Sequence, residues 1–318
     1  MRQNNIFLML LKVFFFSSIL VATSAVRAEL KVVTTIKPLH SLIANVMDGV
    51  GEPALIIEGS TSPHSFTLKP SHAKLLEEAD IIFWVGESIE TFMERPLESI
   101  VKNAEVVEFM EVESINKLKF REESIFEDHD DHDDHDDHDD HSGHDHHGHA
   151  HGEFDAHIWL DPINAKEMVH EIAHELGDLD PANKNKYEAN AQATIQALDQ
   201  LVNDIEKGIN KDAKFVVFHD AYQYFEERFG VRAAGALTLN TDVLPGAKQI
   251  ADIQDVIKDR GIKCIFSDPQ FNPKIITTIA EDMNIKTGVF DPLGANIDSN
   301  KDLYFKLIQN LGNELKGC

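Results

Sequence analysis

The stretch PANKNKYEANAQATIQALDQLVNDIEKGINKD, Pro181–Asp212, separates two halves of the chain that are built on one pattern. It contains no internal proline, and its one glycine stands near its end. Leu198, Leu201 and Ile205 recur at the spacing of one helix face. We therefore predict a single linking helix of roughly 25 residues, about 37 Å long, within residues 182–211.

Short apolar runs alternate with helical patterns on both sides of this stretch. LKVVTTI precedes HSLIANVMDGV in the first half, and KFVVFHD precedes AYQYFEERF in the second. Continuous apolar strands separated by amphipathic helices are typical of parallel sheets that are covered on both faces. The sequence predicts an α/β protein with two doubly wound (β/α) domains, residues 29–181 and 212–318, joined by the long helix.

The first 28 residues have the pattern of a secretory signal peptide. A basic start is followed by an apolar stretch and then by small residues, so we expect cleavage after about Ala28 and export to the periplasm. Lys12 interrupts the apolar stretch, which argues against a membrane-spanning helix. The formal net charge of −26 excludes nucleic acid as a partner, because phosphate would be repelled.

A histidine-rich and aspartate-rich tract, residues 127–151, interrupts the first half. Imidazole and carboxylate bind Zn²⁺ and its first-row neighbours, but a chain without apolar residues to bury defines no single geometry. We expect a mobile insertion with several weak, interchangeable metal sites. Its histidines are His129, His132, His135, His138, His141, His144, His146, His147, His149 and His151.

Four isolated side chains stand near the ends of predicted strands. His64 follows ALIIEG, His157 lies beside the strand-like apolar triplet IWL, and His219 ends KFVVFHD. Asp291 occupies the equivalent end of KTGVFD. Doubly wound sheets bind ligands beyond the carboxyl ends of their strands. The pattern predicts a near-tetrahedral zinc site in the cleft, with two ligands from each domain.

A competing motif lies in HEIAHELGDLD, which matches the zinc-protease pattern H-E-x-x-H at His170, Glu171 and His174. The apolar residues around it form one helical stripe, and both histidines fall on the opposite, polar face. That phase favours a solvated pair, with a weak surface metal site as a further possibility. No nucleophile elbow or phosphate-binding loop is present, so we expect a binding protein rather than an enzyme.

The chain contains two cysteines, Cys264 and Cys318. In an exported protein such a pair is more often a disulfide than a metal site, and two free thiols are the alternative. A bond here would tie the C-terminus to a strand.

Several motifs together resemble the periplasmic zinc-binding proteins of ABC zinc importers, the ZnuA type of metal-binding solute receptors. They are VVTTIKPLHSLIANV, PHSFTLKPSHAKLLEEADIIFWVG, HIWLDP, FVVFHDAYQYFEERFG, CIFSDPQFNP and FDPLGANI, and they cover nearly the whole mature chain. The resemblance implies two lobes on a backbone helix with one metal in the cleft, bound by His64, His157 and His219. It also implies a Cys264–Cys318 disulfide and delivery of zinc to a membrane permease.

The sequence departs from some zinc members, which carry a glutamate where this chain has Pro63. The fourth ligand therefore stays open between Asp291 and water. Manganese relatives use two carboxylates, whereas only Asp291 is in place here, which favours Zn²⁺. The expected protein is a monomeric zinc receptor. A manganese-type receptor, a secreted zinc protease and a metal buffer that binds through the tract alone are the alternatives.

Overall fold

The computed structural model describes residues 29–126, 153–239, 241 and 244–318. The predicted signal peptide and the histidine tract lie outside the described residues. Within the described part of the chain, no helix combines the length and the apolar character needed to cross a membrane.

The N-terminal half contains a four-stranded sheet in the order β2-β1-β3-β4, and every pair is parallel. Its two central strands, β1 and β3, are buried along their whole length, as the continuous apolar runs predict, whereas the edge strands are partly exposed. They are β1 (Val32–Thr34), β2 (Ala54–Leu55), β3 (Ile81–Trp84) and β4 (Glu105–Glu108). The helices of this half are α1 (Lys37–Val46), α2 (Pro70–Glu78), α3 (Glu94–Ser99) and α4 (Pro162–Leu179).

The C-terminal half repeats this topology, with the parallel order β6-β5-β7-β8. Its strands are β5 (Phe215–His219), β6 (Ala236–Thr238), β7 (Cys264–Ser267) and β8 (Lys286–Val289). The helices are α6 (Gln223–Phe229), α7 (Ala247–Asp259), α8 (Lys274–Met283) and α9 (Leu303–Glu314). The predicted fold class is therefore confirmed, with two parallel α/β sheets in one chain.

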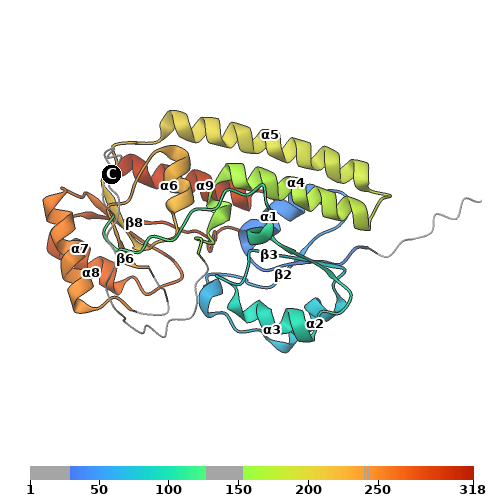
Figure 1. The fold of residues 1–318 in the computed structure, drawn as a ribbon. Coiled ribbons are helices and arrows are strands. Elements are labelled where there is room, and N and C mark those ends of the chain that lie inside the picture. Colours follow the sequence, from blue (N-terminus) through green and yellow to red (C-terminus); the bar gives the residue numbers. More distant parts are fainter. Residues whose placement is uncertain (1–28, 127–152, 240, 242–243) are drawn as a thin grey trace, which may run out of the picture.

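The long helix between the halves is α5, Lys184–Gly208, which has 25 residues. Figure 1 shows it running along both halves of the molecule. The predicted apolar face is confirmed, because Leu198, Leu201 and Ile205 are all buried. It packs against α1 and α4 of the N-terminal half and against α9 of the C-terminal half, so one helix contacts both halves.

The C-terminal helix α9 packs against α1 and α5, so the end of the chain returns to the N-terminal half (Figure 1). Lys37, at the start of α1, donates from its ammonium to the carbonyls of Gly294 (2.6 Å) and Ile297 (2.6 Å). Tyr304 on α9 donates to the carbonyl of Trp159 (2.7 Å), and the Trp159 indole donates to Pro292 (2.8 Å). These buried bonds connect the two halves beneath the cleft.

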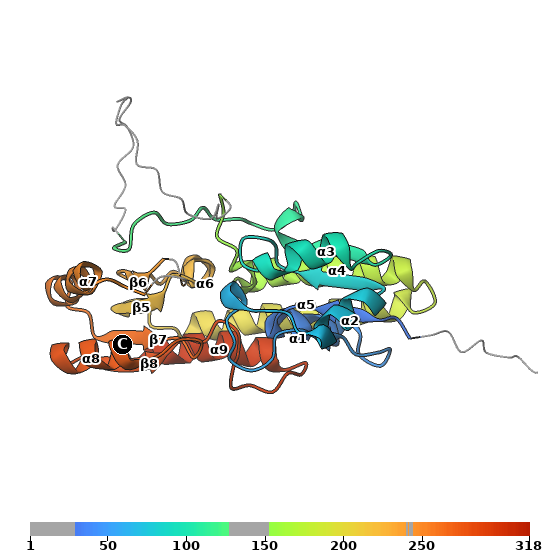
Figure 2. The same cartoon turned by 90° about the horizontal axis from the view of Figure 1, so that it is seen from below.

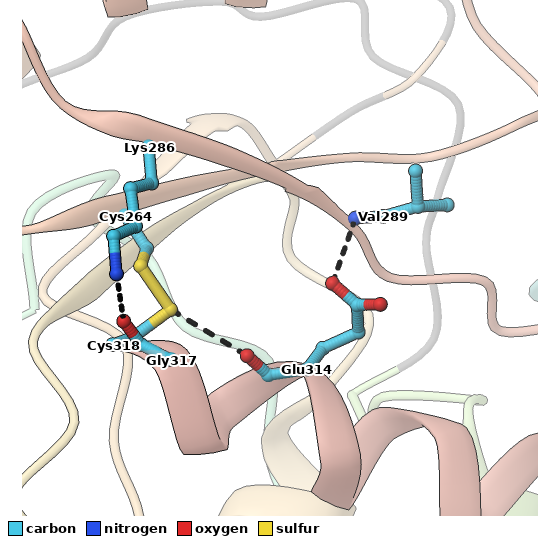
Figure 3. The surroundings of a disulfide bond; sticks show 6 residues. All are labelled: Cys264, Lys286, Val289, Glu314, Gly317 and Cys318. Carbon is cyan, nitrogen blue, oxygen red and sulfur yellow. Dashed lines mark hydrogen bonds between the residues drawn. A yellow bond between two sulfur atoms is a disulfide. The ribbon is translucent and has the colours of Figure 1, made fainter.

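A disulfide joins Cys264, the first residue of β7, to Cys318. Figure 3 shows the bond beside β8, where Lys286 donates to the carbonyl of Gly317 (2.8 Å). The predicted pairing is confirmed, and no thiol remains free. A crosslink over a loop of this size typically contributes about 2–4 kcal/mol to stability.

Candidate metal centre

Three histidines that are far apart in the sequence meet between the two halves. His64 lies in a 3-10 turn, Pro63–Ser65, that follows β2. His157 begins a second 3-10 turn ahead of α4, and His219 is the last residue of β5. Each offers one ring nitrogen, and these three atoms lie within 4.8 Å of one another. Among the described residues, no other group of three metal-ligating side chains comes together.

The three rings are close enough to share one ion. Their centroids are 5.6 Å apart for His64 and His157, 5.4 Å for His64 and His219, and 5.0 Å for His157 and His219. A tetrahedral ion with Zn–N bonds of about 2.0–2.1 Å separates its ligand atoms by about 3.4 Å. Small side-chain movements would therefore close the three nitrogens around a zinc ion.

Asp155 orients the imidazole of His157. Its Oδ1 lies 2.7 Å from Nδ1 of His157 and also accepts the backbone N–H of His157 at 2.9 Å. Because a carboxylate accepts hydrogen bonds, this contact favours the neutral tautomer that carries its proton on Nδ1 and leaves a lone pair on Nε2. Nε2 is buried and has no hydrogen-bond partner among the described residues. A buried acceptor of this kind fits a metal ion.

Tyr224 and the segment before the tract hold Asp155 in place. The Tyr224 hydroxyl donates to the carbonyl of Asp155 at 2.6 Å, and the N–H of Asp155 donates to the carbonyl of Leu118 at 2.8 Å. Such outer contacts raise metal affinity because the ligand does not have to be ordered on binding.

His219 has its own acidic neighbour, Asp268, which follows β7. Oδ2 of Asp268 lies 3.5 Å from Nδ1 of His219, and Tyr222 donates to Oδ1 at 2.6 Å. Burial lowers the pKa of His219 well below its ordinary value, and nearby His157 lowers it further. Burial also raises the pKa of Asp268 to about 8. Metal-free His219 is therefore held neutral, the form that binds zinc.

Asp291, the expected fourth ligand, lies outside the group of three histidines. Its Oδ1 accepts the backbone N–H groups of Leu293 (3.1 Å) and Gly294 (2.9 Å), and its Oδ2 accepts that of Ala295 (2.6 Å). Gln270 donates to the same Oδ1 at 3.2 Å. This carboxylate shapes the turn whose carbonyls receive Lys37. Within the described residues, His219 alone comes from the C-terminal half in this group, and the contribution of two ligands from each half stays a prediction.

The surroundings of the histidines differ on their two sides. One side is almost filled by apolar side chains from both halves, including Ile89, Trp159 and Phe271. The other side opens into a pocket of about 450 Å³, whose polar lining includes Arg121 and Glu153. An ion would thus reach the histidines from the polar side.

Glu153, just after the tract, lines this polar pocket, and Phe126, just before the tract, lies beside the segment that precedes β6. Phe126 donates its N–H to the carbonyl of Ala234, at the edge of β6 (3.1 Å). Phe120 donates its N–H to the carbonyl of Glu153 (3.4 Å), and Glu153 itself lines the pocket. Figure 2 shows the segment before the tract extending from the N-terminal half to the C-terminal half, where Ile125 forms an isolated bridge with Gly235.

The H-E-x-x-H segment lies in α4, and its helix phase is as predicted. The apolar stripe is buried except for half-buried Leu179, and it consists of Ala165, Met168, Val169, Ile172, Ala173 and Leu176. His170 and His174 are exposed on the other side. Within the described residues, the one group of three metal-ligating side chains that meets closely includes neither histidine.

Comparison with known proteins places this geometry in a family. A family described as "Zinc-uptake complex component A periplasmic" matches residues 32–318. The chain belongs to this family. A relative from Brucella abortus, the "High-affinity zinc uptake system protein ZnuA", is 48% identical over 90% of this chain and 91% of its own length. The protein of that name from Yersinia pestis is 33% identical over 95% of each chain.

Solved structures related to this zinc-uptake family show the same fold. The "periplasmic zinc binding protein TroA" from Treponema pallidum superposes with a TM-score of 0.74 at 19% identity, over 91% of this chain and 98% of that one. At this identity the likeness concerns the fold alone.

Proposed function

We propose that the chain is a zinc receptor of the periplasm, which captures Zn²⁺ between its two halves and delivers it to the permease of an ABC importer. The observation that carries this proposal is the group formed by His64, His157 and His219, with ligand atoms within 4.8 Å of one another. Membership of a periplasmic zinc-uptake family supports both the location and the cargo.

Zinc is the cargo that this donor set favours. Three neutral imidazoles suit Zn²⁺, whereas the harder Mn²⁺ prefers more oxygen ligands. The carboxylate of Asp291 is engaged with backbone N–H groups. We infer that water rather than Asp291 completes the tetrahedron. The manganese alternative would need two carboxylates at the metal.

The remaining parts of the proposal concern the ends and the tract. We infer a signal peptide that is cleaved after about Ala28, N-terminal and C-terminal lobes of residues 29–181 and 212–318, and a monomeric mature protein. The histidine tract, residues 127–151, would collect zinc and release it toward the cleft, since Glu153, just after the tract, lines the polar pocket. Its loss should lower uptake at limiting zinc and leave uptake at ample zinc unchanged.

A zinc and manganese competition tests the cargo directly. The mature protein should bind Zn²⁺ in the cleft even when Mn²⁺ is present in a thousand-fold excess, as measured with a chromophoric zinc chelator. Occupancy by Mn²⁺ that equals or exceeds occupancy by Zn²⁺ when the two metals are equimolar would reject the zinc receptor in favour of a manganese type. Zinc-dependent growth of cells that rely on this receptor then tests delivery.

A further inference from the structure

The exposed face of α4 carries two histidines that the cleft does not use. Met168 and Ile172 on the opposite face are fully buried, so the core fixes the rotation of the helix. Asp161 caps its first turn by accepting the N–H of Ile163 at 2.8 Å. His170 and His174 therefore project into solvent from a regular, anchored helix.

The spacing of this pair suits one metal ion. Side chains at positions i and i+4 are neighbours on a helix, with Cβ atoms about 5–6 Å apart. Two imidazoles at that spacing can bind one zinc ion. Two carboxylates lie close to the second imidazole, because Nε2 of His174 is 3.9 Å from Oε1 of Glu175 and 3.9 Å from Oδ2 of Asp178. Either oxygen could reach an ion through a rotamer change or a bridging water.

A strongly acidic groove adjoins the pair. The groove holds about 510 Å³, and no lysine or arginine is among the described residues that line it. Its acidic side chains come from α4 and from the segment around β4, and they are Glu105, Glu108, Glu111, Glu113, Glu171 and Glu175. Burial, followed by the charge of Glu171, raises the pKa of Glu175. A bound cation beside the groove would relieve this repulsion, and the field would attract cations to it.

We propose that His170 and His174 form a second metal site, which binds one first-row divalent cation that accepts nitrogen ligands. Two imidazoles on an exposed helix hold an ion more weakly than three buried ones, so this site fills after the cleft. The site stands on α4 and the groove alone and does not depend on the proposed function of the cleft.

The test uses Ni²⁺ as the probe on the full mature chain, preloaded with one equivalent of Zn²⁺. Nuclear magnetic resonance of ¹⁵N-labelled histidines reports each imidazole, and the variants His170→Asn and His174→Asn assign the two signals. Both signals should broaden together as Ni²⁺ is added. In His170→Asn the Ni²⁺ concentration that half-broadens His174 should rise at least ten-fold, because the chelate is lost.

Two comparisons keep this test specific. His72, a half-buried single histidine on α2, is the internal control and should broaden only at much higher Ni²⁺. Glu171→Gln removes one negative charge from the acidic groove. It should raise the Ni²⁺ concentration that half-broadens the signals of His170 and His174 by two-fold to five-fold. The proposal is overturned if His174 responds equally with and without His170, if neither signal broadens, or if His72 broadens as early.

Discussion

The N-terminal and C-terminal sheets share one strand order, but only the C-terminal half is crosslinked, by Cys264–Cys318. The N-terminal half has no cysteine. It buries the carboxyl group of Glu90, which accepts the backbone N–H groups of Val85 and Gly86. Their shares of the metal site are also unequal, because His64 and His157 belong to the N-terminal half and His219 to the other.

This difference teaches that a repeated scaffold does not make the halves equivalent. A ligand set shared between them binds an ion only while both halves are folded and correctly apposed. The buried bonds of Lys37 and Tyr304 maintain that apposition. Changes in either half can therefore be sorted into those that affect zinc binding and those that affect folding.

The largest effect is expected from removing a ligand on either side of the cleft. His157→Ala and His219→Ala should each weaken zinc binding by about a thousand-fold, or about 4 kcal/mol, because two imidazoles remain for one ion. Competition with a zinc chelator measures this loss. His174→Ala, on the exposed face of α4, is the control and should change the zinc affinity of the tight site by less than two-fold. A small loss in only one of the two cleft variants would mean that the site belongs to a single half.

The crosslink should matter for folding and little for zinc. The double variant Cys264→Ser with Cys318→Ser should lose about 2–4 kcal/mol of unfolding free energy, measured with urea in the metal-free protein. Its zinc affinity should stay within a few-fold of wild type, since the cysteines lie away from the three histidines. A loss of tight binding with an unchanged urea midpoint would contradict this separation.

The carboxylates behind the histidines should give intermediate effects, and the two halves should differ. Asp155→Asn should weaken zinc binding by about 10–100-fold, because Asp155 bonds the ring and the backbone of His157. Asp268→Asn should cost less, since the Asp268 oxygen is 3.5 Å from His219 rather than 2.7 Å. Competition with a zinc chelator, on matched samples of the two variants, ranks their zinc affinities. A larger loss of zinc affinity in Asp268→Asn than in Asp155→Asn would show that the distance between carboxylate and imidazole does not set the contribution to binding.

A pH effect on folding is expected from the N-terminal half. Burial raises the pKa of Glu90 to about 7. The folded chain therefore takes up a proton near pH 7 that the unfolded chain takes up only near its reference pKa of 4.5. The free energy of unfolding therefore increases as the pH falls through 7 toward 5, because only the folded chain binds this proton there. The increase is at most about 1.4 kcal/mol per pH unit.

Glu90→Gln should remove that contribution. Buried Asp220 and Asp268 also have raised pKa values, so the informative quantity is the difference between variant and wild type. Urea midpoints of both metal-free proteins at pH 5.5 and 7.5 measure it. Parallel pH profiles for the two proteins would show that Glu90 does not titrate in this range.

Periodicity made much of this structure predictable. Continuous apolar runs identified the parallel strands, and the spacing of Leu198, Leu201 and Ile205 identified α5. His64 and His219 could be proposed as ligands because strand ends converge in such sheets. The triplet IWL after His157 was harder, because a short apolar run does not distinguish a strand from a helical turn, and here it forms a buried 3-10 turn.

The partners of the ligands could not be predicted in the same way. Asp155 and Asp268 are visible in the sequence, in FDAH and FSDP. Asp155 contacts the imidazole of His157 two residues further on, so this contact is local. Asp268 reaches His219 only because distant segments approach each other, and no local pattern encodes that approach. Asp291 shows the reverse case. Its position after a strand suggested a ligand, but the tight turn that follows supplies N–H groups that engage both oxygens.

The most direct test is zinc stoichiometry and competition affinity for the mature chain that lacks residues 127–151. Circular dichroism first verifies that this variant is folded. The structure predicts that one tight zinc site survives and that His157→Ala then abolishes it. Loss of all tight binding on removal of the tract would contradict a zinc site built by His64, His157 and His219, and would transfer zinc capture to the tract.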